Sequence, residues 1–205
     1  MLEDGNDIFI RYNEAINIYR KIKKFKEKPF NKIVGSRKPF GLPTNFKAFK
    51  KVKDKENSIY LYRFGDNGYV NIKSITKNEQ FIKDWKVLVP KASPGDDSYP
   101  HLILSKPIIS GPESCCTETY ILIGPVASNA RANNIGNYMV TSFFRFMVLL
   151  AKSTQDVTQK TYQFVPMQNF DEKWTDAKLY KKYGITQQEQ SFIDTLIRKM
   201  DHNYE

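Results

Sequence analysis

A short glycine-rich turn between two β-prone runs constrains the fold of this 205-residue chain more than any other feature. Residues 59–64 and 69–72 are rich in Ile, Tyr and other residues that favour strands. The four residues between them are Gly-Asp-Asn-Gly. An Asn-Gly pair readily adopts the positive φ angles of a tight hairpin turn. The sequence therefore predicts a β-hairpin that turns through Asn67 and Gly68.

Further strand and helix signals indicate a mixed fold. Residues 85–89, 106–110 and 119–123 are apolar, β-branched runs bounded by Pro or Gly, so about five strands are expected in one mixed or antiparallel sheet. Ser128 begins a long helix that Lys152 closes, and its apolar face is expected to pack on the sheet. That face comprises Ile135, Met139, Phe143, Phe146 or Met147, and Leu150.

Helices are predicted at both ends of the chain. Asp7 caps an amphipathic, basic helix that ends before Pro29, because proline disfavours helix in the residue ahead of it. A second helix, capped at residues 175–176, ends at Gly184, and a capping box at residues 186–189 starts the last one. The apolar positions of the first helix are Ile8, Tyr12, Ala15, Ile16, Tyr19 and Ile22.

These signals together predict an α/β chain of the α+β type. A mixed, mainly antiparallel sheet of about five strands packs against a long helix, with a basic N-terminal helix and two short C-terminal helices. We expect residues 1–28 to form a connecting helix and residues 29–205 to form a single domain. No internal repeat or low-complexity linker divides the sequence.

Positive charge is concentrated in one segment. Residues 20–55 contain fourteen Lys and Arg and two acidic residues, a net charge of +12 in a chain of net charge +10. Phe residues are interleaved with the cations, a combination that suits a polyanion such as nucleic acid. A solvated basic face that aids solubility explains a charge run equally well. Gly and Pro make residues 32–49 an expected exposed loop.

Several classes of protein and site are disfavoured. The longest apolar stretch, residues 143–151, is interrupted by an arginine and is too short to span a bilayer. The N-terminus lacks the apolar core of a signal peptide, so we expect a cytoplasmic protein. Cys115 and Cys116 are neighbours unsuited to a disulfide and, with His101 and His202, match no zinc spacing. Buried, reduced thiols are expected.

The sequence carries no recognised catalytic motif. It lacks the G-x-x-x-x-G-K-[ST] and G-x-G-x-x-G phosphate loops, the G-x-S-x-G turn and a paired-histidine zinc helix. A nuclease would need clustered carboxylates around a divalent metal. Asp96-Asp97 and Asp171-Glu172-Lys173 are the nearest candidates, and a Pro-Gly turn and a helix entry explain them equally well.

Seven short blocks follow one another over nearly the whole chain. They are Ser36-Arg37-Lys38-Pro39-Phe40-Gly41-Leu42, Asp84-Trp85-Lys86-Val87-Leu88-Val89-Pro90-Lys91, Cys115-Cys116-Thr117-Glu118-Thr119-Tyr120, Phe143-Phe144-Arg145-Phe146, Thr154-Gln155-Asp156, Phe164-Val165-Pro166 and Leu179-Tyr180-Lys181-Lys182-Tyr183-Gly184. In that order they resemble the C-terminal part of adenine-specific DNA methyltransferases of bacterial restriction-modification systems. The resemblance implies a target recognition domain, which in that family follows a Rossmann-like domain that binds S-adenosylmethionine and flips the adenine.

The resemblance also implies where the methyl transfer takes place. The family's catalytic Asn-Pro-Pro-Tyr is absent, since no two prolines are adjacent, and the glycines of residues 64–68 have the spacing of a turn instead of the cofactor motif. We therefore expect no cofactor and no methylation by this chain alone, with S-adenosylmethionine bound by an upstream domain. The expected partners are double-stranded DNA and that upstream methyltransferase domain, and no membrane. A free-standing recognition subunit is the alternative to a piece of a larger protein.

We expect cationic side chains to contact the phosphates of DNA, and Arg, Lys or Asn side chains to contact the base edges. Phosphate contacts are expected from Lys23, Lys24, Lys32, Lys47, Lys50 and Lys51, and base contacts from Arg37, Lys38 and Asn45. A loop with Lys91, Ser93, Tyr99 and His101, and a polar connection with Lys152, Thr154, Gln155 and Lys160, are further candidates. The last group also suits docking to the upstream domain. In an alternative packing, Phe40 and Leu42 enter the core while Arg37 and Lys38 still face outward.

Other interpretations stay open. Arg145 lies within an apolar run and is expected to pair with a carboxylate such as Glu118. Exposed aromatic rings that stack on bases are a minor possibility. A protein-interaction module that docks an acidic partner and a nuclease piece of the same restriction system are rival functions. Preference for one duplex over another separates a recognition domain from charge-driven docking.

Overall fold

A computed structural model describes residues 12–54, 57–93 and 99–200. Within these ranges the helices are α1 (Asn13–Lys23), α2 (Asn129–Met139), α3 (Ser142–Ala151), α4 (Asp176–Tyr183) and α5 (Gln187–Leu196). The strands are β1 (Ser58–Tyr62), β2 (Gly68–Asn71), β3 (Trp85–Pro90), β4 (Ile108–Ser110), β5 (Ser114–Cys116) and β6 (Tyr120–Val126). Short 3-10 helices are η1 (Phe30–Ile33), η2 (Ile72–Ser74), η3 (Glu79–Lys83) and η4 (Gln159–Tyr162). Asp7, Ile8, Asp96, Asp97 and His202 lie outside the described residues.

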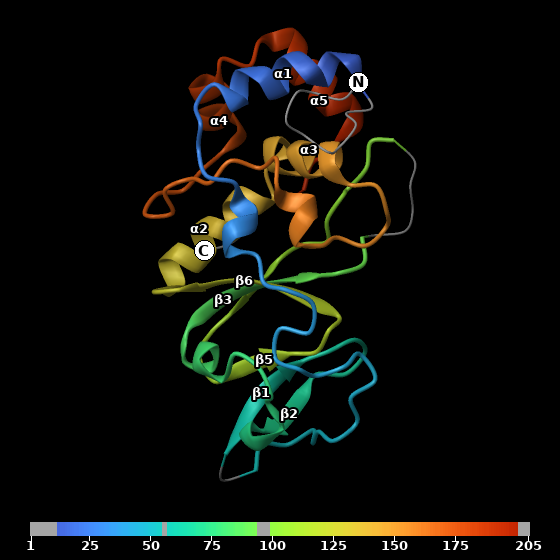
Figure 1. Cartoon of the computed structure of the whole chain (residues 1–205), viewed down its shortest axis with the longest axis vertical. Coiled ribbons are helices and arrows are strands. Elements are labelled where there is room, and N and C mark those ends of the chain that lie inside the picture. The colour runs from blue at the N-terminus through green and yellow to red at the C-terminus, as the bar shows by residue number, and fades with distance from the viewer. Residues whose placement is uncertain (1–11, 55–56, 94–98, 201–205) are drawn as a thin grey trace.

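The molecule is elongated, with the two sheets in different parts of it (Figure 1). Helices α1, α3, α4 and α5 gather at one end, β3 and β6 cross the middle, and β1, β2 and β5 form the other end. The first sheet has the order β4-β3-β6, with β3 antiparallel to both neighbours. The second has the order β2-β1-β5, with β1 antiparallel to β2 and parallel to β5.

The predicted mixed, mainly antiparallel α/β architecture is confirmed, but the prediction of one sheet with about five strands is wrong. The strands divide into two sheets of three. No sequence signal predicts β5, a Ser-Cys-Cys strand without β-branched residues. Its conformation depends on pairing with β1, a contact between segments far apart in the chain.

The predicted hairpin is confirmed and its turn lies within residues 63–67, but the expected role of Asn67 and Gly68 in the turn is wrong. Leu61 pairs with Gly68, so Gly68 is a buried strand residue. The positive φ of the turn falls on Gly65, at 81°, instead of on Asn67. A Cβ atom on Gly68 would lie 2.5 Å from the carbonyl oxygen of Lys50. The glycine is therefore required for close contact with the segment before β1, not for the turn.

The long helix predicted after Ser128 is two helices. Ser128 caps α2 as expected, but a second cap at Thr141 starts α3. The Thr141 hydroxyl accepts a hydrogen bond from the Phe144 N–H at 3.1 Å. The Asp176 carboxylate of α4 accepts two more, from the first two N–H groups of α3, at 3.0 and 2.8 Å. These acceptors satisfy N–H groups that a continuous helix would have bonded internally.

The two C-terminal helices follow the sequence signals closely, whereas α1 begins after an N-cap at Tyr12 and ends at Lys23, short of the predicted end before Pro29. Gly184 ends α4 with a φ of 63°, and Thr186 and Glu189 form the predicted capping box of α5. Lys21 of α1 pairs with Glu189 at 2.7 Å and so ties the two ends of the chain together. The buried residues of α1 are Ala15, Ile16, Ile18, Tyr19 and Ile22, which all belong to the main core.

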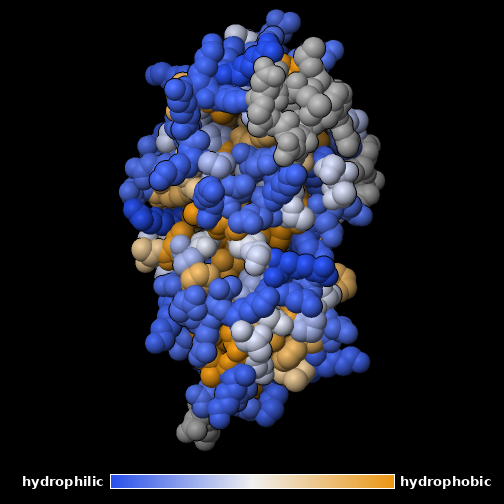
Figure 2. Space-filling view, viewed as in Figure 1, coloured by the Kyte–Doolittle hydropathy of each residue, from blue (hydrophilic) through white to orange (hydrophobic). Residues whose placement is uncertain are grey.

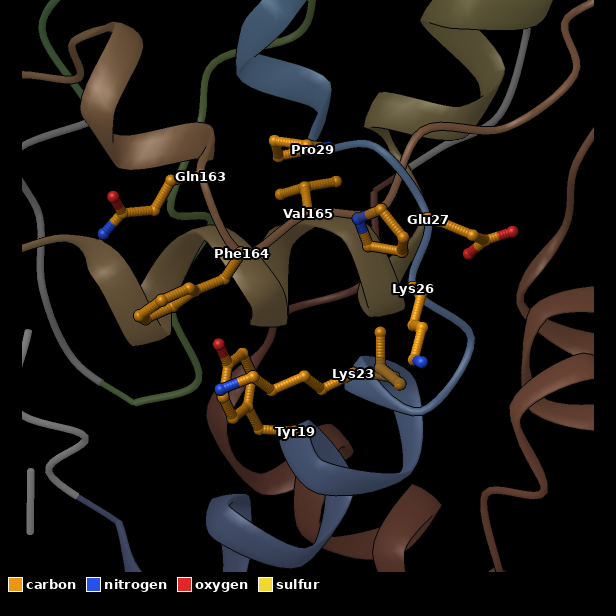
Figure 3. Close-up of a pocket in the computed structure, with 10 residues that line it drawn as sticks. Tyr19, Lys23, Lys26, Glu27, Pro29, Gln163, Phe164 and Val165 are labelled. Atoms are coloured by element: carbon orange, nitrogen blue, oxygen red, sulfur yellow. The ribbon is translucent and has the colours of Figure 1, made fainter. Parts of the chain in front are cut away.

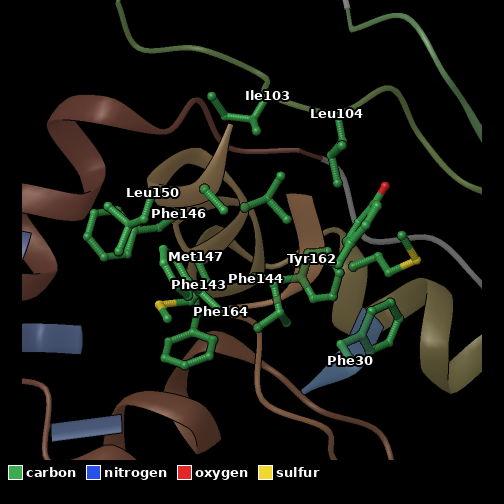
Figure 4. Packing of buried hydrophobic residues seen from close by; sticks show 14 of the residues in the cluster. Phe30, Ile103, Leu104, Phe143, Phe144, Phe146, Met147, Leu150, Tyr162 and Phe164 are labelled. Carbon is green, nitrogen blue, oxygen red and sulfur yellow. The ribbon is translucent and has the colours of Figure 1, made fainter. Parts of the chain in front are cut away.

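Strand β3 is shared between two hydrophobic cores. Val87 and Val89 belong to the larger core and Leu88 to the smaller one, as the alternation of a strand requires. Figure 4 shows the larger core, where rings of α3 meet Phe30 and Tyr162. The smaller core takes in the hairpin together with Phe40 and Leu42. The loop of residues 32–49 therefore follows the alternative packing, and Arg37 and Lys38 remain accessible, with side chains 76% and 42% exposed.

The predicted pair between Arg145 and Glu118 is wrong. The guanidinium of the buried Arg145 donates to backbone carbonyls, among them that of Leu102 at 3.2 Å and that of Arg198. Burial lowers the pKa of Arg145 to about 10, and the charge of Asp176 partly opposes this shift. Arg145 holds three segments of the helical end together through its Nε and Nη1 atoms, while its Nη2 is buried without a hydrogen-bond partner among the described residues.

Lys86 is a buried lysine whose role the sequence analysis missed. Its ammonium donates to the carbonyl oxygens of Phe81, Asp84 and Gly111 at 3.2, 2.9 and 3.1 Å. Burial lowers the pKa of Lys86 to about 8. The three acceptors join η3 and the turn after β4 to the central strand, so the residue is structural.

We expect Asp176→Ala to lower the free energy of unfolding by about 1–2 kcal/mol, because the first N–H groups of α3 lose their acceptor. Urea unfolding followed by circular dichroism measures the change. Asp194→Ala, which removes an exposed carboxylate from α5, is the matched control and should change the value by less than about 0.5 kcal/mol. Equal losses in the two variants would show that Asp176 does not cap α3.

The stability conferred by Lys86 should depend on pH. Its folded pKa of about 8 lies below the ordinary value of 10.5, so the unfolded chain binds more protons between these two pH values. The free energy of unfolding of the wild type should therefore rise with pH across this window, relative to Lys86→Met. Denaturation of both proteins at several pH values measures the difference, and exposed Lys83→Met should show no such trend. A difference that is constant with pH contradicts the lowered pKa.

Candidate nucleic-acid interface

A cleft of about 530 Å³ lies where four separate segments meet beside β6. The cleft collects cationic and polar side chains from the loop of residues 32–49, from the end of β3 and from the segment after α3. The lining residues are Gly35, Ser36, Arg37, Lys91, Glu118, Tyr120, Ile121, Asp156, Val157, Thr158, Gln159 and Lys160.

Backbone hydrogen bonds hold the walls of the cleft in place. The Gly35 N–H donates to the Leu122 carbonyl of β6 at 2.7 Å. The backbone carbonyl of Lys91 accepts a hydrogen bond from the Val157 N–H at 2.9 Å, which brings the segment after α3 beside the end of β3. The side-chain amide of Gln159 donates to the Val34 carbonyl at 2.9 Å and closes the ring of segments. A rigid scaffold thus presents the loops, an arrangement common in binding sites.

Glu118 organises the charges at one side of the cleft. Its buried carboxylate accepts a hydrogen bond from the Arg37 guanidinium and pairs with Lys38 at 3.5 Å. Burial alone would raise the pKa of Glu118, but the hydrogen bond and charge of Arg37 outweigh it and hold the pKa below its ordinary value, helped by Lys38 and Lys91. Glu118 therefore stays ionised and fixes the exposed Arg37–Lys38 turn against the sheet.

The other side of the cleft is less fully neutralised. Lys91 pairs with Asp156 at 3.3 Å. The ammonium of Lys160, in η4, is exposed and makes no ion pair or hydrogen bond with the described residues. Arg37, Lys38, Lys91 and Lys160 thus face two carboxylates, so the cleft keeps a positive balance. Gln155 is exposed next to it.

Several predicted contact residues lie away from this cleft. Lys23 and Lys24 are exposed at the C-terminal end of α1, and Lys152 ends α3. Tyr99 and His101, whose ring centroids are 4.0 Å apart, lie beside α5, since the His101 N–H donates to a carbonyl at its end. Lys32 is the exception: it is exposed in η1, next to the cleft wall, since the Gln159 amide donates to the carbonyls of Asn31 and Val34 on either side of it. Ser93 is buried and donates to the carbonyl of Ile103, so its role is structural.

A third group lies along the β-hairpin. The backbone of Lys50 exchanges two hydrogen bonds with Tyr69 of β2, at 2.9 and 2.7 Å. Lys51 pairs with Asp66 in the turn at 2.8 Å, and Asn45 and Lys47 are exposed earlier in the same segment. The cations of residues 20–55 therefore do not form one patch: some lie by α1 and others at the opposite end of the molecule (Figure 1).

A smaller pocket of about 170 Å³ opens at the end of α1 (Figure 3). Lys23 and Lys26 line it together with Tyr19 and Phe164. Glu27, also at its wall, pairs with Lys182 at 2.6 Å. The small volume and this internal ion pair make the pocket a less suitable binding site than the larger cleft.

The groups considered for metal or nucleophilic chemistry have structural surroundings. Cys115 and Cys116 are buried free thiols, as expected, and burial raises the pKa of Cys115 to about 12. Asp171 pairs with Arg131 at 2.6 Å and Glu172 with Lys178 at 2.9 Å. Within residues 12–54, 57–93 and 99–200, no three His, Cys, Asp or Glu side chains gather where they could hold a metal ion. None of the helices described there is long and apolar enough to cross a membrane.

Sequence reasoning identified the cations of the cleft but not the residues that assemble it. Asp156 and Gln159 have no signal of their own, because their importance comes from contacts with Lys91 and Val34 across the chain. Glu118 lies in one of the seven blocks, but the only contact predicted for it is the pair with Arg145. Neither comparison with known proteins adds to this description: no protein-family model matches the chain, and a search of curated proteins finds no similar sequence.

Proposed function

We propose that the chain binds duplex DNA at the cleft, as the target recognition part of an adenine-specific DNA methyltransferase. The observation that carries the proposal is the meeting of Arg37, Lys91 and Lys160 from three distant segments around one cavity. Cations that converge from separate segments on a fixed scaffold suit the regularly spaced phosphates of a duplex. Surface cations that served only solubility would have no reason to converge.

The carboxylates of the cleft are compatible with DNA binding. Glu118 orients Arg37 through its buried oxygen while most of the Arg37 side chain stays exposed. A guanidinium held in this way offers its remaining N–H groups to a phosphate or to the O6 and N7 atoms of guanine. Gln155, exposed beside the cleft, provides the amide that suits adenine. Phosphate contacts then fall to Lys91 and Lys160.

The sequence blocks that resemble the methyltransferase family support this assignment. Four of them, which begin at Ser36, Asp84, Cys115 and Thr154, supply or border residues of the cleft. The other three contribute Phe143, Phe164, Leu179 and other residues to the larger core. In the proposed role the chain positions DNA, and an upstream domain with S-adenosylmethionine transfers the methyl group to adenine. No residue of this chain takes part in that chemical step.

We expect Lys160→Ala to weaken binding to a pool of random-sequence duplexes and to reduce the slope of log K against log salt by about one. The reason is the loss of one phosphate contact from an exposed ammonium in the cleft. Fluorescence anisotropy at several salt concentrations measures both quantities. Lys173→Ala, which removes an exposed lysine from the segment before α4, is the matched control and should leave the slope unchanged.

The same measurements separate the proposed function from its rivals. A recognition domain should also prefer some duplexes when the bound fraction is selected and sequenced. Binding that is purely charge-driven, without any preference, would favour a module that docks an acidic protein. No binding by the wild type even at low salt would overturn the proposal.

A further inference from the structure

The tip of the β1–β2 hairpin presents an aromatic ring to solvent. Phe64 is 74% exposed, whereas Leu61 of the same hairpin is fully buried. Val52, which follows Lys51 in the segment beside the tip, is 76% exposed. Phe64 makes no ring contact with the described residues, and the glycine that follows it has positive φ. A side chain this exposed buries little apolar area, so it contributes little to folding and is accessible to a ligand.

Cations lie in the tip and in the segment beside it. The Arg63 guanidinium lies 4.4 Å from the centroid of the Phe49 ring, and the Lys51 ammonium lies 5.8 Å from the same centroid. The Phe49 ring therefore holds both cations beside the tip. Lys50 and Lys53 belong to the same segment, with side chains 68% and 53% exposed. Lys50, Lys51 and Lys53 form exposed ion pairs with Asp54, Asp66 and Glu113, whereas Arg63 makes no ion pair with the described residues. One cation next to the exposed ring is therefore left for a polyanion.

The backbone of the tip is held in one conformation. The Arg63 N–H donates to the side-chain oxygen of Asn67 at 3.1 Å, and the Arg63 guanidinium donates to the Asp66 carbonyl at 3.2 Å. Lys51 adds its ion pair to Asp66. These contacts close the turn on both sides of Phe64, so the ring is presented without a large loss of conformational entropy on binding.

The hairpin tip and the cleft lie at the same end of the second sheet. β1 and β5 run parallel, with Tyr62 opposite Cys116, and the Thr117 N–H donates to the Tyr62 carbonyl at 3.0 Å. The tip starts one residue after Tyr62, and Glu118, which holds Arg37, follows Thr117 directly. A ligand that covers the cleft can therefore reach the tip as well.

We infer that Phe64 is a wedge that contacts the faces of bases in bound duplex DNA, with Arg63 and Lys51 on the phosphates at either side. The inference rests on the proposed function. It adds that the bases of the bound duplex are partly unstacked. Apolar side chains flanked by cations insert between base steps in many proteins that bend DNA. A single ring with a neighbouring valine is too small an apolar area for a stable protein interface.

The test measures duplex binding and base unstacking in parallel. The probe is a pool of random-sequence duplexes in which the adenines of one strand are replaced by 2-aminopurine, whose fluorescence rises when it unstacks. The wild type should raise this fluorescence. Phe64→Ala should abolish the rise and weaken binding by about 10-fold, as expected for the loss of one stacking contact. Phe64→Trp should preserve both signals, and its own emission should be quenched by DNA.

Phe25→Ala is the matched control, since it removes a ring that is 47% exposed beside α1. It should leave both signals at the wild-type level, and equal melting temperatures confirm that all variants are folded. If the wild type binds without a rise in fluorescence, or if Phe64→Ala behaves as wild type, the inference that Phe64 is a wedge is wrong. The proposal that the chain binds duplex DNA then still stands. If the wild type does not bind, both the wedge and the proposed function are overturned.

Discussion

The burial of β3 on both faces is the constraint on which the rest of the structure depends. Val87 and Val89 pack under the helices, and Leu88 packs over the hairpin, so one strand joins two cores that would otherwise be separate. The second face also receives Lys86, whose ammonium requires three carbonyl acceptors in fixed positions. The central sheet therefore determines how the two ends of the molecule are placed relative to each other.

The surface follows from this arrangement. Because both faces of the central sheet are covered, polar loops gather at its edges, and the cleft beside β6 is one such place. Figure 2 shows hydrophilic side chains over most of the visible face, with apolar ones between the two ends. Glu118 and Asp156 keep the cations of the cleft at fixed positions without cancelling their charge. This combination of fixed position and residual charge suits recognition better than an unpaired basic arm would.

Local sequence signals predicted the local features of this fold. The caps at Ser128, Thr186 and Gly184 were found because each depends on one residue and its near neighbours in sequence. The break at Thr141 was not found, since two of the three capping hydrogen bonds at the start of α3 go to Asp176 in another helix. The division into two sheets, the β5 strand and the partners of Arg145 likewise depend on contacts between distant segments, which periodicity does not encode.

The distribution of charge shows that local sequence signals are limited in the same way when they are used to predict the candidate site. The run of cations in residues 20–55 is the clearest polar signal in the sequence, yet the fold separates its members between α1, the cleft and the hairpin. The cleft instead draws Lys91 and Lys160 from outside the run. Long-range attraction of a polyanion depends on the total charge, whereas its orientation depends on the few cations that the fold brings together. A charge run can therefore indicate the class of partner, but only the sheet edges that bring Arg37, Lys91 and the hairpin tip together can determine how that partner lies.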